Sequence, residues 1–160
     1  MSFKLDLRLE NDSVLLARLG TNLKCMNQLR LSKDSRYPWL ILVPEIDHAV
    51  ELHELSSTQQ YDILQISNIV SLLLSNCFAP DKLNIACLGN IVRQLHIHHV
   101  ARFESDKAWS GPIWGQGTAN LYNSDDLGKR ILLLKKGLVE LEKNQNFETL
   151  HGKVEFIYTI

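Results

Sequence analysis

The sequence predicts an α+β fold in which two main helices accompany an antiparallel sheet of about five strands. Segments with the patterns of strands cluster in the first two thirds of the chain, and one helical segment interrupts them. A second helical segment follows the last of these strands. Because helices and strands do not alternate regularly, an antiparallel sheet is favoured over a doubly wound parallel one.

Four segments before residue 44 have patterns typical of strands. The first alternates polar and apolar residues, and the next two flank Gly20-Thr21-Asn22, which is typical of a hairpin turn. The fourth is continuously apolar, as expected of a central strand buried on both faces. We expect these strands at residues 4–9, 14–19, 23–31 and 39–43, with a turn at Lys33–Arg36 before the last and Pro44 after it.

Two later segments have the period of an amphipathic helix. The first begins at a capping box, Ser56-Ser57-Thr58-Gln59, and ends before Pro80. The second begins at Ser124-Asp125-Asp126, whose side chains can cap it. We expect the remaining elements to be a strand at 83–88, a tight turn at Gly89-Asn90, a strand at 94–103, a loop at 103–122, and a short strand or arm at 154–160.

Composition indicates one domain. The chain has 160 residues, of which 45% are hydrophobic, enough for one core, and no linker or repeat divides it. We expect a single domain at 1–160, with residues 143–160 as a C-terminal extension. The three cysteines are odd in number and form no C-x-x-C pair, so a reduced, cytoplasmic protein is the simplest interpretation.

The charge of the chain indicates neither nucleic acid nor a membrane as a partner. The formal net charge is −1, which gives no overall attraction to polyanions. The compact basic pairs, Lys129-Arg130 and Lys135-Lys136, fit a solvated face of the second helix better than a phosphate track. No apolar run approaches the roughly 20 residues that cross a bilayer, and the N-terminus lacks the apolar core of a secretory signal.

Three of the six histidines lie in the segment QLHIHHVARF, residues 94–103. In a strand, one face of this segment is apolar apart from His99, which we expect to be a hydrogen-bonded residue under a helix. The other face carries Gln94, His96 and His98. The Cα atoms of His96 and His98 would lie about 7 Å apart, so both rings can reach one small anionic group.

Three interpretations of this histidine pair are open from the residues alone. The pair could be two surface residues of an edge strand. It could bind a metal, although zinc needs a third ligand, and the spacing of His48, His53 or a carboxylate does not indicate one. It could also serve nucleophilic catalysis on a phosphate, because a neutral imidazole attacks an electrophile while a second one stabilises an anion.

The segment QLHIHHVAR resembles the signature of the histidine triad (HIT) superfamily, H-φ-H-φ-H-φ-φ, where φ is apolar. Matching Arg102 to the arginine of the signature places Gln94 at the first histidine, His96 at the middle one and His98 at the last. The form Q-x-H-x-H-H is similar to that of a bacterial branch of the family. The first triad histidine and the phosphate-contacting loop of many members are absent.

The resemblance extends over roughly residues 14–115. The apolar run WLILVP, the helix that begins at Ser56, and the strand with Leu83-Asn84-Ile85 are similar to family elements in the same order. The segment AWSGPIWG, at 108–115, is similar to a segment of the bacterial branch. This breadth makes the short histidine motif more specific than it would be alone.

The resemblance implies a nucleotide hydrolase or nucleotidyl transferase that acts at the α-phosphate of a nucleoside 5′-phosphate conjugate, such as a dinucleoside polyphosphate or a phosphoramidate. His96 would attack the phosphorus and form a covalent nucleotidyl-histidine intermediate. His98 would contact the phosphate oxygens. Gln94 cannot exchange protons at neutral pH, so it would have a positioning role near the leaving group.

Other residues have two interpretations each. Asn84 would hold the ribose or phosphate of the substrate, or it satisfies backbone groups at the end of a strand. Asn90 would replace the missing phosphate loop, or it is a turn residue. Trp109 and Trp114 would close over the pocket, or they pack the loop onto the sheet.

The resemblance also implies a homodimer and no required cofactor, with Mg²⁺ as a companion of polyphosphate substrates only. Two alternatives remain at this point. One is a catalytically weak HIT-fold module that binds nucleotides. The other is a metal-binding protein that uses His96 and His98.

Overall fold

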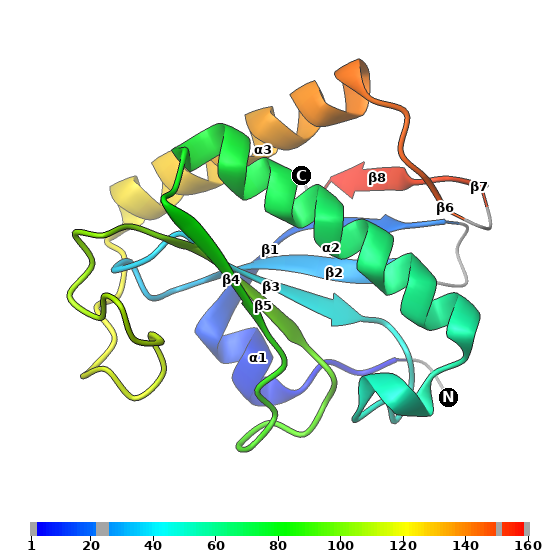
Figure 1. Ribbon diagram of the computed structural model, residues 1–160, viewed down its shortest axis with the longest axis horizontal. Helices are drawn as coiled ribbons and strands as arrows, with labels where there is room; N and C mark the ends of the chain where they lie inside the picture. Colours follow the sequence, from blue (N-terminus) through cyan, green and yellow to red (C-terminus); the bar gives the residue numbers. More distant parts are fainter. Residues whose placement is uncertain (1–2, 22–25, 150–151, 159–160) are drawn as a thin grey trace.

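A six-stranded antiparallel sheet forms the centre of the computed structural model, which describes residues 3–21, 26–149 and 152–158 (Figure 1). The strand order is β4-β5-β3-β2-β1-β8, and every neighbouring pair is antiparallel. The predicted fold class is therefore confirmed, with six strands in the main sheet in place of about five. The strands are β1 (Ser13–Gly20), β2 (Met26–Ser32), β3 (Trp39–Pro44), β4 (Lys82–Ala86), β5 (Ile97–Arg102) and β8 (Glu155–Tyr158).

Two long helices, α2 (Ser57–Phe78) and α3 (Ser124–Asn144), pack on one face of the sheet and on each other (Figure 1). The capping box predicted at Ser56 is present, because its hydroxyl accepts from the Gln59 N–H and the Gln59 side chain accepts from the Ser56 N–H. The apolar faces of both helices supply eight of the twenty described buried residues of the main core, and the strands and connections supply the others. That core includes Ile63, Ile66, Val70, Leu73, Leu74, Leu134, Leu138 and Leu141.

The central strand β3 divides the core into two sides. Leu40 and Leu42 join the main core under the helices, whereas Ile41 and Val43 form a smaller cluster with Leu9 on the opposite face. Burial on both faces explains the continuous apolar run of this strand, as predicted. The smaller cluster lies on the same face of the sheet as His98.

The prediction of a strand at residues 4–9 is wrong. This part of the chain contains a short helix, α1 (Leu7–Asp12), whose first turn is capped by the Asp6 carboxylate, which accepts from the Arg8 N–H at 2.8 Å. Six residues are too few to separate the two periodicities, and the cap decides in favour of the helix. In Figure 1, α1 lies on the face of the sheet opposite α2 and α3.

Two smaller expectations also need correction, and a third is not tested. The side chain that caps α3 belongs to Asn123, which accepts from the Asp126 N–H, and not to Ser124. The hairpin turn predicted at Gly20-Thr21-Asn22 lies partly outside the described residues. β4 ends at Ala86, two residues earlier than expected.

The segment expected as a C-terminal extension, 143–160, contributes a strand to the main sheet. Within the described part of this segment, β8 pairs with β1, and Phe156 and Tyr158 pack against the main core. The minor elements are η1 (Leu52–Glu54), β6 (Glu148–Thr149) and β7 (Gly152–Lys153). None of the helices in the described ranges is both long and apolar enough to cross a membrane.

Candidate functional site

The histidine segment enters the sheet later than its pattern predicts. β5 begins at Ile97, so His96 stands one residue before the strand, and residues 87–96 form an irregular connection from β4. The tight turn predicted at Gly89-Asn90 is therefore wrong. The connection is fixed at its end by the Leu95 N–H, which donates to the Ala49 carbonyl at 2.9 Å.

His96 and His98 nevertheless lie side by side. Their ring centroids are 4.7 Å apart and the rings meet edge to face. Both side chains are largely buried, with 5% and 6% of the surface of each residue exposed. The structure thus brings together the two histidines that the alternation of a strand predicted to share a face.

Hydrogen bonds define the protonation of the two rings. The Nδ1–H of His96 donates to the Gln94 carbonyl at 2.6 Å, since a carbonyl only accepts, and this leaves Nε2 of the neutral ring with a free lone pair. Nδ1 of His98 accepts from the indole N–H of Trp39 at 3.0 Å, which places the proton of a neutral ring on Nε2. The pair thus offers one nucleophilic nitrogen and one N–H donor.

His98 stays neutral over the whole physiological range. Burial, reinforced by the neighbouring His96 and His99, lowers its pKa from 6.5 to about 3. Its interaction with an anion is therefore a hydrogen bond from a neutral imidazole and not an ion pair.

Two tryptophans hold the His98 ring from the sides. Trp39 makes an edge contact at a centroid distance of 5.3 Å, and Trp114 lies 5.4 Å from His98 and 6.2 Å from Trp39. Sequence reasoning identified Trp39 only as part of a buried strand. Its proximity to His98 depends on the register of β3 against β5, in which Trp39 pairs with Val100.

Removing the Trp39 N–H should change the tautomer of His98 and, under the function proposed below, slow the reaction. In Trp39→Phe a smaller phenyl ring replaces the indole, Nδ1 of His98 loses its donor, and the proton can move from Nε2 to Nδ1. We expect a rate loss of about tenfold, the equivalent of one hydrogen bond. The ¹⁵N chemical shifts of the His98 ring should report the mixed tautomer, and Trp109→Phe should change neither shift nor rate.

His99 lies on the opposite face, as predicted. Nε2 of His99 is 2.7 Å from the Ser67 hydroxyl of α2, and only 1% of the residue is exposed. Burial lowers the pKa of His99 from 6.5 to about 4. This histidine therefore belongs to the core between the sheet and α2.

The depressed pKa values predict acid sensitivity. Below pH 6.5 the imidazoles of the unfolded chain take up protons, whereas His99 and His98 of the folded chain stay neutral down to about pH 4 and about pH 3. The free energy of unfolding should fall as the pH drops from 6.5 toward 4, by up to about 1.4 kcal/mol per pH unit for each histidine. Urea unfolding at pH 6.5, 5.5 and 4.5 should show a shallower slope for His99→Gln, and an unchanged slope would contradict this account.

A cavity of about 290 Å³ opens beside the two histidines. Its volume is close to the lower end of ligand pockets, roughly 300 Å³. Apolar side chains from four parts of the chain make most of its wall, with a few polar groups among them. The lining residues are Arg8, Leu9, Asp12, Ser32, Trp39, Ile41, Leu88, Asn90, Ile91, Val92, His96, His98 and Trp114.

Of the other predicted site residues, some line the cavity and others lie elsewhere. Asn90 lines the cavity, whereas Asn84 does not, and the Asn84 Oδ1 accepts from the buried Arg102 guanidinium at 2.8 Å. Trp114 lines the cavity, while Trp109 is 41% exposed and lies over the Arg102 guanidinium. Asn84 thus contacts the group that anchors the end of β5.

Gln94 faces the N-terminal segment. Its Oε1 accepts from the Asp6 N–H and its Nε2 donates to the Lys4 carbonyl, each at 2.9 Å. Its role near a leaving group remains a prediction. Sequence reasoning missed the partners of Gln94 and the cavity residues Arg8 and Leu9, because no local pattern connects positions 88–90 residues apart.

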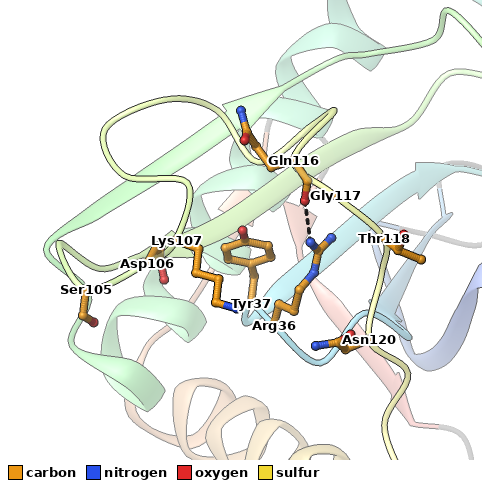
Figure 2. Close-up of a pocket in the computed structure, with 9 residues that line it drawn as sticks. All are labelled: Arg36, Tyr37, Ser105, Asp106, Lys107, Gln116, Gly117, Thr118 and Asn120. Carbon is orange, nitrogen blue, oxygen red and sulfur yellow. Dashed lines mark hydrogen bonds between the residues drawn. The ribbon is translucent and has the colours of Figure 1, made fainter.

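A larger cavity of about 590 Å³ is lined by Arg36, Tyr37 and residues of the loop at 103–122 (Figure 2). Its main cation, Arg36, is already bound by the Asp34 carboxylate and donates to the Gln116 carbonyl. None of the described residues that line it is a histidine or cysteine. Both His96 and His98 line the cavity of about 290 Å³, whereas a neighbouring cavity of about 470 Å³ is lined by His96, Gln94 and Asn90.

The described part of the chain places no third metal ligand beside the histidine pair. Among the described residues, no three histidine, cysteine, aspartate or glutamate side chains gather closely enough to hold a metal ion.

The fold and the paired imidazoles define a class of protein, an α+β domain in which two histidines next to an edge of the sheet meet at a ligand-sized cavity. Comparison with known proteins agrees: the model of the HIT domain family matches residues 25–105. No curated protein matches the chain.

Solved structures of histidine triad proteins are similar to the whole fold. The protein of Sinorhizobium meliloti is 39% identical, with a TM-score of 0.76, and the alignment covers 84% of this chain and 96% of that one. Those of Marinobacter aquaeolei and Bradyrhizobium japonicum are 35% and 33% identical, with TM-scores of 0.78 and 0.74. They cover 88% and 86% of this chain, and 99% of each relative is covered. The chain belongs to the histidine triad family.

Proposed function

We propose that this protein is a nucleotide hydrolase or nucleotidyl transferase that cleaves at the α-phosphate of a nucleoside 5′-phosphate conjugate, a dinucleoside polyphosphate or a phosphoramidate. The observation that carries the proposal is the hydrogen bond from His96 Nδ1 to the Gln94 carbonyl. It gives His96 a free Nε2 beside the N–H donor of His98, at the wall of the cavity.

The reaction has two steps. Nε2 of His96 attacks the α-phosphorus, and the bond from phosphorus to the leaving oxygen or nitrogen breaks, which gives a nucleotidyl-histidine. The bonding electron pair stays on the leaving group, and an amine leaving group takes a proton from water. Water then attacks the same phosphorus, which releases the mononucleotide and restores the imidazole. The ring of His96 gains positive charge on attack, so its bond to the Gln94 carbonyl strengthens in the transition state.

Two further residues would contact the phosphate. The Nε2–H of His98 donates to a phosphate oxygen, and its neutral state at working pH makes this donor permanent. Asn90, whose side chain can donate from its amide, takes the place of the phosphate loop. Asn84 would support the site through Arg102, since its side-chain oxygen accepts from that guanidinium.

The test is a search for the intermediate with α-³²P-labelled substrates. Dinucleoside polyphosphates and nucleoside phosphoramidates are incubated with the protein, the phosphoramidate also with EDTA, and the quenched protein is digested. We expect base-stable, acid-labile label on the peptide that contains His96, and turnover of the phosphoramidate in EDTA. Label on a peptide that lacks His96 would refute the assignment.

One observation favours a second candidate, a catalytically weak nucleotide-binding module. The amide of Gln94 is bonded to the N-terminal segment, so the side chain at the first triad position has partners other than a leaving group. Under this candidate, nucleotides bind at the cavity, no labelled intermediate accumulates, and His96→Ala leaves a low basal rate unchanged.

The expected homodimer and cytoplasmic location belong to this proposal as well. β4 is an edge strand of the sheet, and its Ile85 is 52% exposed, which leaves a partly apolar edge for pairing with a second copy. Analytical ultracentrifugation of the full chain should give twice the mass of 18.3 kDa. A monomer at micromolar concentration would remove the dimer from the proposal.

A further inference from the structure

The side-chain amide and the backbone carbonyl of Gln94 form hydrogen bonds with two different parts of the site. The side chain holds the N-terminal segment at both of its polar atoms, through the Asp6 N–H and the Lys4 carbonyl. The carbonyl of the same residue accepts from His96 Nδ1. One residue therefore contacts both the N-terminal segment and the proposed nucleophile.

The N-terminal segment builds one wall of the cavity. Asp6, which Gln94 holds through its backbone, also caps α1 through its side chain. Three α1 residues, Arg8, Leu9 and Asp12, line the cavity. Leu9 is buried against Ile41 and Val43, which seats the helix on the sheet. The position of α1 thus depends on a short stretch of chain that Gln94 holds by two hydrogen bonds.

This wall carries the cation of the cavity. Arg8 is the one lysine or arginine among the described residues that line it, and His98 is neutral. Arg8 lies 3.6 Å from Asp12, with side chains 60% and 67% exposed, and such exposed pairs are weak. The guanidinium is therefore available to a phosphate oxygen of a ligand.

We propose that Gln94 is a positioning residue, whose amide clasps the N-terminal segment so that α1 presents Leu9 and Arg8 to the ligand. Position 94 then governs ligand binding, and the chemical step needs only its backbone carbonyl. This explains why the first triad position functions without a titratable side chain. The ligand class, an anionic nucleotide, rests on the proposed function, whereas the clasp itself does not.

The clasp is tested on the full chain with Gln94→Ala and Gln94→Glu, and with the exposed Gln145→Ala as the control. Glutamate keeps the acceptor for the Asp6 N–H but loses the donor to the Lys4 carbonyl. Hydrogen exchange measures the amides of residues 7–12, calorimetry measures the affinity for AMP, and labelled substrate gives KM and the maximum rate of intermediate formation.

We expect Gln94→Ala to speed exchange in α1, to weaken AMP binding and raise KM by about tenfold, and to leave the maximum rate within about twofold. Gln94→Glu should fall between wild type and alanine. The double variant Arg8→Ala/Gln94→Ala should bind AMP no more weakly than Arg8→Ala within about twofold, since both act through one wall.

A fall in the maximum rate with unchanged α1 exchange and AMP affinity would overturn the clasp and place the amide at the reacting phosphate. Unchanged values in all measurements would overturn it as well. Failure of the proposed function has a different signature. In that case wild-type protein forms no labelled intermediate, while exchange and AMP affinity still report whether Gln94 holds α1.

Discussion

Replacing His96 with alanine should abolish formation of the labelled intermediate and lower turnover by about 10⁴-fold or more, because the attacking nitrogen is removed. The cavity wall loses one ring, but His98 keeps its bond from Trp39. AMP binding should therefore change much less than the rate. Single-turnover measurements with labelled substrate, at saturating enzyme, separate the two effects.

A suitable control is His53→Ala, which changes an exposed histidine of η1 outside the cavity lining. It should react at the wild-type rate. A His96→Ala variant that still accumulates label at wild-type levels would exclude His96 as the nucleophile and direct attention to His98.

Replacing Asp106 with alanine should produce a large loss of stability, because Asp106 is the ion-pair partner of the buried Arg102 at the end of β5. Its carboxylate accepts from the Arg102 Nε at 2.8 Å and from the Phe103 N–H at 3.0 Å. The Arg102 side chain is 1% exposed, so the variant leaves a buried guanidinium without its counter-charge. Removing one partner of a buried pair costs about 3–5 kcal/mol, which urea unfolding can measure.

The matched control is Lys129→Ala, which breaks an exposed pair with Asp126 whose side chains are 77% and 57% exposed. We expect a loss of less than about 1 kcal/mol. If Asp106→Ala does not fold, Arg102→Leu/Asp106→Ala should recover part of the stability, because it removes both charges. Equal losses for Asp106→Ala and Lys129→Ala would contradict the argument.

The histidine pair and the long helices could be predicted because their signals are local. Alternation places His96 and His98 on one face whatever the neighbouring strands are, and the capping box at Ser56 marks the start of α2 within four residues. The prediction for the short N-terminal segment was wrong because its local pattern is ambiguous. Six residues are too few to distinguish a period of 2 from a period of 3.6, and the Asp6 cap is the feature that indicates the helix.

The rest of the site depends on contacts between distant positions. Trp39 meets His98 only because β3 and β5 pair in one particular register, and Arg8 reaches the cavity only because α1 is held beside the β4–β5 connection. From its motif alone, Gln94 is expected to have a positioning role near the leaving group. In the structure, both polar atoms of its side chain form hydrogen bonds with residues 88 and 90 positions away.

The arrangement of indoles around His98 supplies an optical signal for occupancy. The chain has three tryptophans, and two of them, Trp39 and Trp114, belong to the cavity wall, while the third is at the surface. A nucleobase stacked there would quench emission from the enclosed pair and leave that of Trp109 as an internal reference. Unlabelled protein can therefore be titrated directly in a fluorimeter, and candidate substrates can be ranked before any turnover assay exists.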